Sequence, residues 1–158
     1  MRIIGIDPGT AITGFSIIEV KNKKLNLLDH GYIRTPKGLQ NCQRLNQISQ
    51  DLKTIVKKWS PSRAAVEKIY FSKNVKTAIS VAEARGVVTQ IFAEQGIEVD
   101  EFGPSEIKSA VCGNGSADKK AVQKMVKLIM NLETIPKPDD VADAIAIAIC
   151  SANTKIRQ

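Results

Sequence analysis

The sequence predicts an α/β fold in which a five-stranded mixed β-sheet carries α-helices on both faces. Three closely spaced β-type segments open the chain. Two more follow, each preceded by a helix-length segment with apolar residues at helical spacing. A three-strand meander followed by β-α-β crossovers produces a sheet with both antiparallel and parallel pairs. With 158 residues, 43% of them apolar, the chain is expected to form a single domain over residues 1–158.

The first part of the chain supplies the meander and the first crossover. Its strands are expected at 2–7, 12–20 and 25–34. Pro8-Gly9 reverses the chain after the first strand, and the polar segment 21–24 forms the second turn. A helix is expected at 41–58, because one of its faces is apolar through Leu45, Ile48, Leu52, Ile55 and Val56. Ser60-Pro61 ends that helix and leads into a short fourth strand at 63–67.

The rest of the chain is predicted to be mostly helical. Residues 68–75 form a connecting loop, a long helix follows at about 75–95, and the fifth strand covers 97–102. The flexible turn Gly113–Ser116 separates the next two helices. The last three helices are expected at about 105–111, 117–131 and 139–152.

Four carboxylates are the candidate site. Asp7 ends the first strand and Glu67 ends the fourth, and a charge at the end of a buried strand is costly unless it is paired or binds a metal. Asp140 and Asp143 are spaced i,i+3 at the start of the last helix, so they share one helix face. Two alternatives stay open: Asp7 could simply accept hydrogen bonds in its turn, and Asp139, i,i+4 from Asp143, competes with Asp140.

A divalent cation would relieve the repulsion among converging carboxylates. Two unit charges about 4 Å apart repel by about 4 kcal/mol at an effective dielectric constant near 20. Carboxylate oxygens without a cluster of His or Cys suit Mg²⁺ far better than zinc. The three cysteines are odd in number and widely scattered, so they predict neither a disulfide framework nor a zinc site and fit a reducing cytoplasm.

The charge balance points to a polyanionic partner. The chain has 23 Lys and Arg against 16 Asp and Glu, a net charge of +7. Phosphate contacts dominate the affinity of such proteins for nucleic acids. No 18-residue apolar run and no basic amphipathic helix is present, so we expect no membrane association. Lys120, Lys124 and Lys127 follow helical spacing and are also explained as a solvated helix face.

Six motifs, in order along nearly the whole chain, together resemble the RuvC family of Holliday junction resolvases. This family belongs to the RNase H-like and retroviral-integrase superfamily. The motifs are Ile4-Gly-Ile-Asp7-Pro-Gly-Thr with Gly14, Val66-Glu67-Lys-Ile-Tyr70-Phe-Ser-Lys73-Asn74, Glu83-Ala-Arg85-Gly86, Ile107-Lys108, Gly113-Asn-Gly115-Ser116-Ala-Asp-Lys119 and Asp140-Val-Ala-Asp143-Ala-Ile-Ala-Ile-Ala.

The resemblance implies an RNase H-like fold and an endonuclease that cuts four-way DNA junctions by paired symmetric nicks in recombination and repair. It implies that Asp7, Glu67, Asp140 and Asp143 are both the catalytic residues and the metal ligands. The cofactor would be two Mg²⁺ ions per site, about 3.5–4 Å apart, with Mn²⁺ as a substitute. The products would carry 5′-phosphate and 3′-hydroxyl ends.

The resemblance also implies DNA contacts and partners. Tyr70 matches the family's base-stacking aromatic, although the adjacent Phe71 is an alternative and both could be packing residues. Lys73, Lys108 and Lys119 are the expected basic contacts to DNA. A junction has two-fold symmetry, so a homodimer is expected, with helix 75–95 as the candidate interface. The branch-migration complex RuvA-RuvB is the expected protein partner, and a cytoplasmic, nucleoid-associated location is expected.

Three other functions share single features of this sequence. The segment Asp7-x-Gly-Thr also opens actin-like ATPases and sugar kinases, but such an enzyme needs a chain more than twice as long. A different RNase H-like nuclease of the YqgF type has a similar first motif, whereas Glu67-x-x-Tyr70 and Asp140-x-x-Asp143 favour RuvC. A non-catalytic junction-binding module would leave the four acids unexplained.

Overall fold

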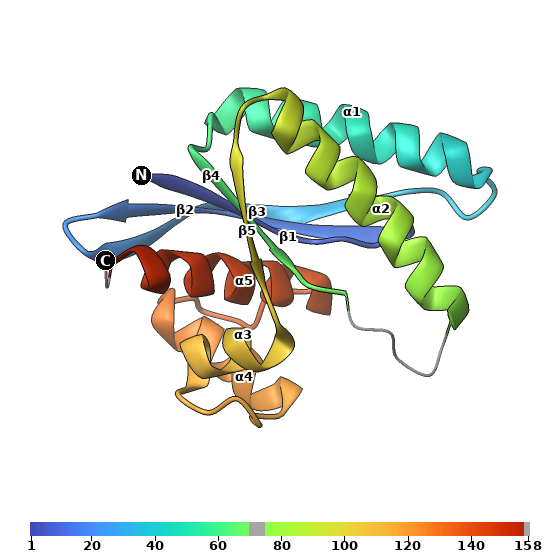
Figure 1. Cartoon of the computed structure of the whole chain (residues 1–158). Coiled ribbons are helices and arrows are strands. Elements are labelled where there is room, and N and C mark those ends of the chain that lie inside the picture. The colour runs from blue at the N-terminus through green and yellow to red at the C-terminus, as the bar shows by residue number, and fades with distance from the viewer. Residues whose placement is uncertain (70–74, 157–158) are drawn as a thin grey trace.

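The computed structural model describes residues 1–69 and 75–156, and its strands form the predicted five-stranded mixed sheet (Figure 1). The strands are β1 (Arg2–Asp7), β2 (Ile12–Lys21), β3 (Lys24–Arg34), β4 (Arg63–Glu67) and β5 (Glu98–Phe102). Their order across the sheet is β3-β2-β1-β4-β5. The pairs β3-β2 and β2-β1 are antiparallel, whereas β1-β4 and β4-β5 are parallel. The α/β fold class is therefore confirmed.

Helices cover both faces of the sheet (Figure 1). The five helices of the described residues are α1 (Asn41–Trp59), α2 (Val75–Glu94), α3 (Pro104–Cys112), α4 (Lys119–Ile129) and α5 (Asp139–Ile156). Side chains alternate along β1, so Ile4 and Ile6 pack in one core with α1 and α2. Ile3 packs in a second core with α3, α4 and α5. Within the described ranges, no helix is both long and apolar enough to cross a membrane.

The boundaries of several elements differ from the predicted ones for local reasons. The polar turn is tighter than expected: Asn22 and Lys23 have φ angles of 51° and 62°, and β2 and β3 continue up to them. Two consecutive residues with positive φ match a right-twisted hairpin. Helix α4 begins at Lys119 rather than at 117, because the side chain of Asp118 caps it by accepting a hydrogen bond from the Ala121 N–H.

Helix α5 runs four residues beyond its predicted end at 152. The extra turn is anchored to α3, because the Asn153 side-chain amide donates a hydrogen bond to the Ala110 carbonyl at 3.1 Å. Such a contact joins distant parts of the sequence and leaves no periodic signal in the helix itself. The long α5 is therefore a tertiary feature, fixed by its packing.

Helix α5 lies unusually close to β1 and β2 because the strands present glycines to it. A Cβ atom at Gly5 would collide with the Ala144 carbonyl oxygen, and one at Gly14 would collide with the Asp140 carbonyl. Between them, the buried Ser16 hydroxyl donates a hydrogen bond to the Ala144 carbonyl at 3.0 Å. These contacts fix both the distance of α5 from the sheet and its position along the strands. The first turn of α5 lies above the Gly14 end of β2.

A charged network joins three elements at the other end of α5. The guanidinium of Arg63 on β4 donates two hydrogen bonds to Asp100 on β5, at 2.8 and 3.1 Å. Ser151 on α5 donates a third at 2.7 Å. Burial raises the pKa of Asp100, but the hydrogen bonds from Arg63 and Ser151 outweigh it and hold the pKa below its ordinary value.

We expect Gly14→Ala to destabilise the fold and to displace the start of α5, because its methyl group must push the Asp140 backbone away from β2. Overpacking of this kind costs about 1–3 kcal/mol. Urea unfolding followed by circular dichroism measures the change. Gly38→Ala is the control, because a Cβ atom there meets nothing within 4 Å. Equal stability of the two variants would contradict the close contact.

We expect Asp100→Asn to lower stability at pH 7 by about 1–3 kcal/mol, because it removes the acceptor of a charged network. A carboxylate whose pKa is lowered by folding stabilises the protein above its ordinary pKa, and this stabilisation is lost as the pH falls through the folded-state value. Unfolding measured from pH 7 to pH 2 should therefore show a weaker acid dependence in the variant. Asp51→Asn, on α1 across the sheet, should keep the wild-type profile.

Candidate active site

The sheet places Asp7 and Glu67 side by side. Strands β1 and β4 are parallel, and their last paired residues are Ile6 and Val66. The next residue of each strand is a carboxylate, so both acids emerge at the same edge of the sheet. Both carboxylates are partly buried. Adjacent parallel strands therefore build half of the acidic cluster.

Helix α5 brings the other two acids to this edge. Asp7 is paired with Gly14 in the β1-β2 ladder, and the Asp140 backbone packs against Gly14. Asp140 therefore lies above the Asp7 end of the sheet, and Asp143 follows one turn later on the helix. The charges of Asp143, Asp140 and Glu67 all act on the Asp7 carboxyl. The structure thus brings all four predicted acids into one electrostatic cluster.

The cluster strongly perturbs its own titration. Burial, followed by the negative charges of Asp143, Asp140 and Glu67, raises the pKa of Asp7 to about 8. Burial and the charge of Asp143 also raise the pKa of Glu67. Burial raises the pKa of Asp143 as well, although Lys119 opposes it. Such perturbed carboxyl groups in one cleft are typical of functional sites.

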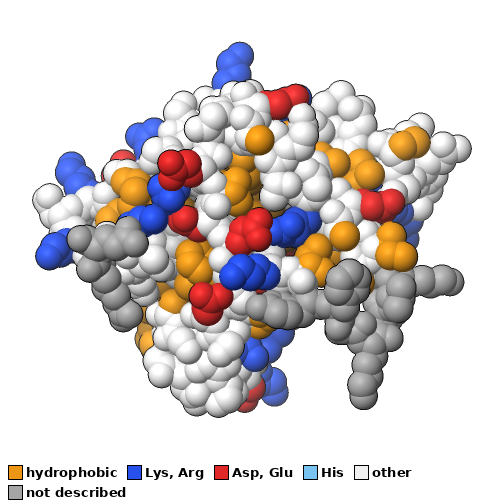
Figure 2. Space-filling view, in the orientation of Figure 1, with side chains coloured by type: hydrophobic (Ala, Val, Ile, Leu, Met, Phe, Trp, Pro, Cys, Tyr) orange, Lys and Arg blue, Asp and Glu red, His pale blue; other side chains and the backbone are white. Residues whose placement is uncertain are grey.

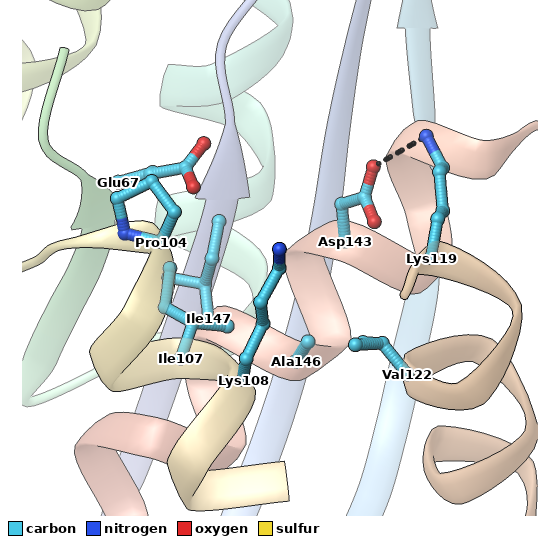
Figure 3. Close-up of a pocket in the computed structure, with 9 residues that line it drawn as sticks. All are labelled: Glu67, Pro104, Ile107, Lys108, Lys119, Val122, Asp143, Ala146 and Ile147. Carbon is cyan, nitrogen blue, oxygen red and sulfur yellow. Dashed lines mark hydrogen bonds and ion pairs between the residues drawn. The ribbon is translucent and has the colours of Figure 1, made fainter. Parts of the chain in front are cut away.

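Two lysines supply positive charge to the cluster. Lys119, the first residue of α4, donates a hydrogen bond to Asp143 Oδ2 at 3.1 Å (Figure 3). Lys108 on α3 points toward the space between Glu67 and Asp143 (Figure 3), and both lysines lower the pKa of Glu67. On the face of the molecule that Figure 1 shows, acidic and basic side chains lie next to one another (Figure 2). Lys108 and Lys119 therefore lie where they could contact a phosphate bound at the acidic cluster.

Asp139, at the start of α5, is held by two lysines. Its Oδ1 accepts a hydrogen bond from Lys137 at 2.8 Å, and its Oδ2 lies 3.4 Å from the Lys119 Nζ. The hydrogen bond from Lys137 lowers the pKa of Asp139. Asp140, by contrast, is one of the charges that act on Asp7. This arrangement favours Asp140 as the third acid of the cluster.

The donor set of the cluster fits a hard divalent cation. It consists of carboxylate oxygens alone, which are the ligands that Mg²⁺ prefers. The Lys119 ammonium already lies beside Asp143, which shows that positive charge is favourable at this position. Across the described ranges, no three Asp, Glu, His or Cys side chains are grouped closely enough to hold an ion as they stand. Side-chain rotation would therefore be needed to close a metal site.

A cavity of about 280 Å³ opens between Glu67 and Asp143, beside the acidic cluster (Figure 3). Its mouth is framed by the two acids and the two lysines. Its interior is apolar and is lined by Pro104, Ile107, Val122, Ala146 and Ile147. Of these, Ile107, Val122, Ala146 and Ile147 belong to the hydrophobic core that packs α3 and α4 on α5.

The structure does not describe two of the predicted DNA contacts, and it shows one supporting residue that the sequence did not predict. Tyr70 and Lys73 fall outside the described residues. Arg85 on α2 donates a hydrogen bond to the Glu67 carbonyl at 3.3 Å and forms an ion pair with Glu101 at 2.7 Å. It therefore fixes the end of β4 that carries Glu67. Its place in the motif Glu83-Ala-Arg85-Gly86 was a signal, but the motif alone does not reveal the contact.

Comparisons with known proteins point to one family. The profile of the family described as crossover junction endodeoxyribonuclease RuvC matches residues 3–151. A relative with that name from Heliobacterium modesticaldum is 48% identical, over 98% of this chain and 95% of its own length. A relative of the same name from Chloroflexus aurantiacus is 49% identical, over 98% and 94%.

Solved structures show the same relationship. RuvC from Thermus thermophilus superposes with a TM-score of 0.89 at 30% identity, covering 99% of this chain and 97% of that one. The structure of that protein in complex with a Holliday junction substrate gives a TM-score of 0.88 at 28% identity, covering 99% and 96%. The family profile, the relatives and the fold converge, and the chain belongs to the RuvC family of crossover junction endodeoxyribonucleases.

Proposed function

We propose that this protein is a structure-selective endonuclease that resolves Holliday junctions by paired symmetric nicks, in DNA recombination and repair. The observation that carries the proposal is the cluster of Asp7, Glu67, Asp140 and Asp143, flanked by Lys108 and Lys119. The cluster lies on a fold shared with a RuvC whose structure was solved with a Holliday junction substrate. Phosphodiester hydrolysis of this kind needs carboxylates that bind a cation and positive charges that bind phosphates.

The four carboxylates would hold two Mg²⁺ ions, with Mn²⁺ as a substitute. When bound, these ions would supply Lewis-acid stabilisation and a hydroxide-like water, leaving 5′-phosphate and 3′-hydroxyl ends. The chain's own residues do the positioning: parallel strands hold Asp7 and Glu67, and α5 holds Asp140 and Asp143 over them. Lys108 and Lys119 face the same opening and would bind the phosphates that flank the cleaved bond.

The assembly around this site is proposed on symmetry and on family resemblance. Two equivalent nicks in a two-fold symmetric junction require two active sites, which a homodimer supplies. We assign the dimer contact to α2, base stacking to Tyr70 and a further phosphate contact to Lys73. The RuvA-RuvB branch-migration complex is the proposed partner, in the cytoplasm and at the nucleoid.

A gel assay tests the activity and the role of the acids together. We expect the wild-type protein to cut a synthetic four-way junction in the presence of Mg²⁺ and to leave a linear duplex of the same sequence uncut. Asp7→Asn should lower the cleavage rate at least about 100-fold, equivalent to about 2.7 kcal/mol, because the acid on which the other three charges act is lost. Binding to the junction should be kept or strengthened, because a negative charge near the phosphates is removed.

Glu133→Gln is the control for charge, because Glu133 is an exposed acid in the connection before α5. It should cut at the wild-type rate. Full activity in Asp7→Asn would contradict the catalytic assignment. Junction binding without cleavage by the wild-type protein, in both Mg²⁺ and Mn²⁺, would instead favour a non-catalytic binding module.

A comparison of substitutions at Lys119 and at Lys124 distinguishes a role in the reaction from a general effect of positive charge. Both lie on α4, but only Lys119 contacts the acidic cluster. Lys119→Ala should lower single-turnover cleavage about 10- to 100-fold at saturating protein, because a cation at the reacting phosphate stabilises the transition state. Lys124→Ala should change cleavage by less than about twofold and should slightly reduce the salt dependence of binding. Equal losses in the two variants would reduce Lys119 to a general phosphate contact.

A further inference from the structure

Lys119 is held by two acids that have different surroundings. Its Nζ atom lies 3.1 Å from Asp143 Oδ2 and 3.4 Å from Asp139 Oδ2. The two acids are one turn apart on α5, so the ammonium bridges an i,i+4 pair. Asp143 belongs to the acidic cluster around Asp7, whereas Asp139 lies at its rim.

Asp139 is itself held in place from the other side. Lys137 donates a hydrogen bond to its Oδ1 at 2.8 Å, which leaves Oδ2 directed at Lys119. Asp139 is the first residue of α5, and the Lys137-Pro138 segment precedes it directly. The carboxylate therefore sits between two ammonium groups, one on each oxygen. It is an oriented acceptor, although its side chain is 43% exposed.

Under the proposed function, metal binding would weaken only one of the two ion pairs of Lys119. An Asp143 carboxylate that binds Mg²⁺ loses most of its attraction for an ammonium, because the cation neutralises it and repels Lys119. Only Asp139 would then hold the lysine. Without it, the flexible four-carbon side chain of Lys119 would turn toward solvent, away from the cation.

We propose that Asp139 is a positioning residue, which keeps Lys119 directed into the cleft when Asp143 binds metal. The inference rests on the proposed function, in which Asp143 is a metal ligand and Lys119 contacts the DNA phosphate. Asp139 touches neither the metal nor the DNA and acts through Lys119 alone. It thus differs from Asp140, which acts directly in the acidic cluster.

Amine labelling tests the positioning without any cleavage. Lys119 reactivity toward an acylating reagent is measured by peptide mass spectrometry, with exposed Lys124 as the internal reference. In the wild-type protein we expect Lys119 to stay protected both without and with saturating Mg²⁺. In Asp139→Asn it should be protected without Mg²⁺, because Asp143 still binds it. With Mg²⁺, its labelling should rise about two- to fivefold, the size of an exposed ion pair.

Asp139→Glu, which restores the charge, should return the labelling to the wild-type pattern. The proposal is overturned if Mg²⁺ exposes Lys119 equally in the wild-type protein, or if Asp139→Asn stays protected with Mg²⁺ bound. Metal binding itself is checked in each variant by calorimetry, so a lost metal site cannot be mistaken for a protected lysine.

A double-mutant cycle on junction cleavage separates this role from two others. We expect Asp139→Asn to slow single-turnover cleavage about two- to fivefold in the wild-type background, and to change nothing further in Lys119→Ala. A loss that persists in Lys119→Ala would make Asp139 a metal ligand or a structural residue and would overturn the proposal. A wild-type protein that cuts no junction would refute the proposed function, whereas the labelling result would still decide the role of Asp139.

Discussion

The close contact between α5 and the first two strands is the constraint on which the site depends. Gly5 and Gly14 remove the side chains that would otherwise separate helix and sheet, and Ser16 adds a buried hydrogen bond to the helix backbone. A helix standing one side chain further out would leave its acids too far from the Asp7 end of β1. The small residues are therefore what converts three separate sequence segments into one acidic cluster.

The same contact creates the electrostatic difficulty of the site. Exclusion of water from Asp7, together with the charges of three nearby acids, raises its pKa to about 8. Packing on both faces of the sheet must offset that unfavourable energy, because neither the acids nor the exposed ion pairs around them can. A cluster that is poor for stability yet built from buried, well-ordered elements is typical of a binding or catalytic centre.

Sequence patterns predicted the sheet, the helices and the adjacency of Asp7 and Glu67, because these follow from local periodicity and from the geometry of parallel strands. The contacts that orient the site did not follow, because each joins residues far apart in the chain. Arg85 reaches back to the Glu67 carbonyl, and Lys119 meets Asp143 across 24 positions. Asp139 and Asp140 are sequence neighbours, yet Asp139 contacts Lys137 and Lys119, whereas the Asp140 backbone packs on Gly14.

The lysines of the site owe their positions to packing rather than to their ion pairs. Lys119 is 55% exposed, and an ion pair at such exposure contributes at most about 1 kcal/mol. Beneath the lysines, Ile107 and Val122 pack α3 and α4 onto α5 around the apolar cavity. Hydrophobic burial thus holds the two helices, and the helices hold the lysines. Under the proposed function, a phosphate would then replace the Asp143 carboxylate as a partner of Lys119 without disturbing the fold.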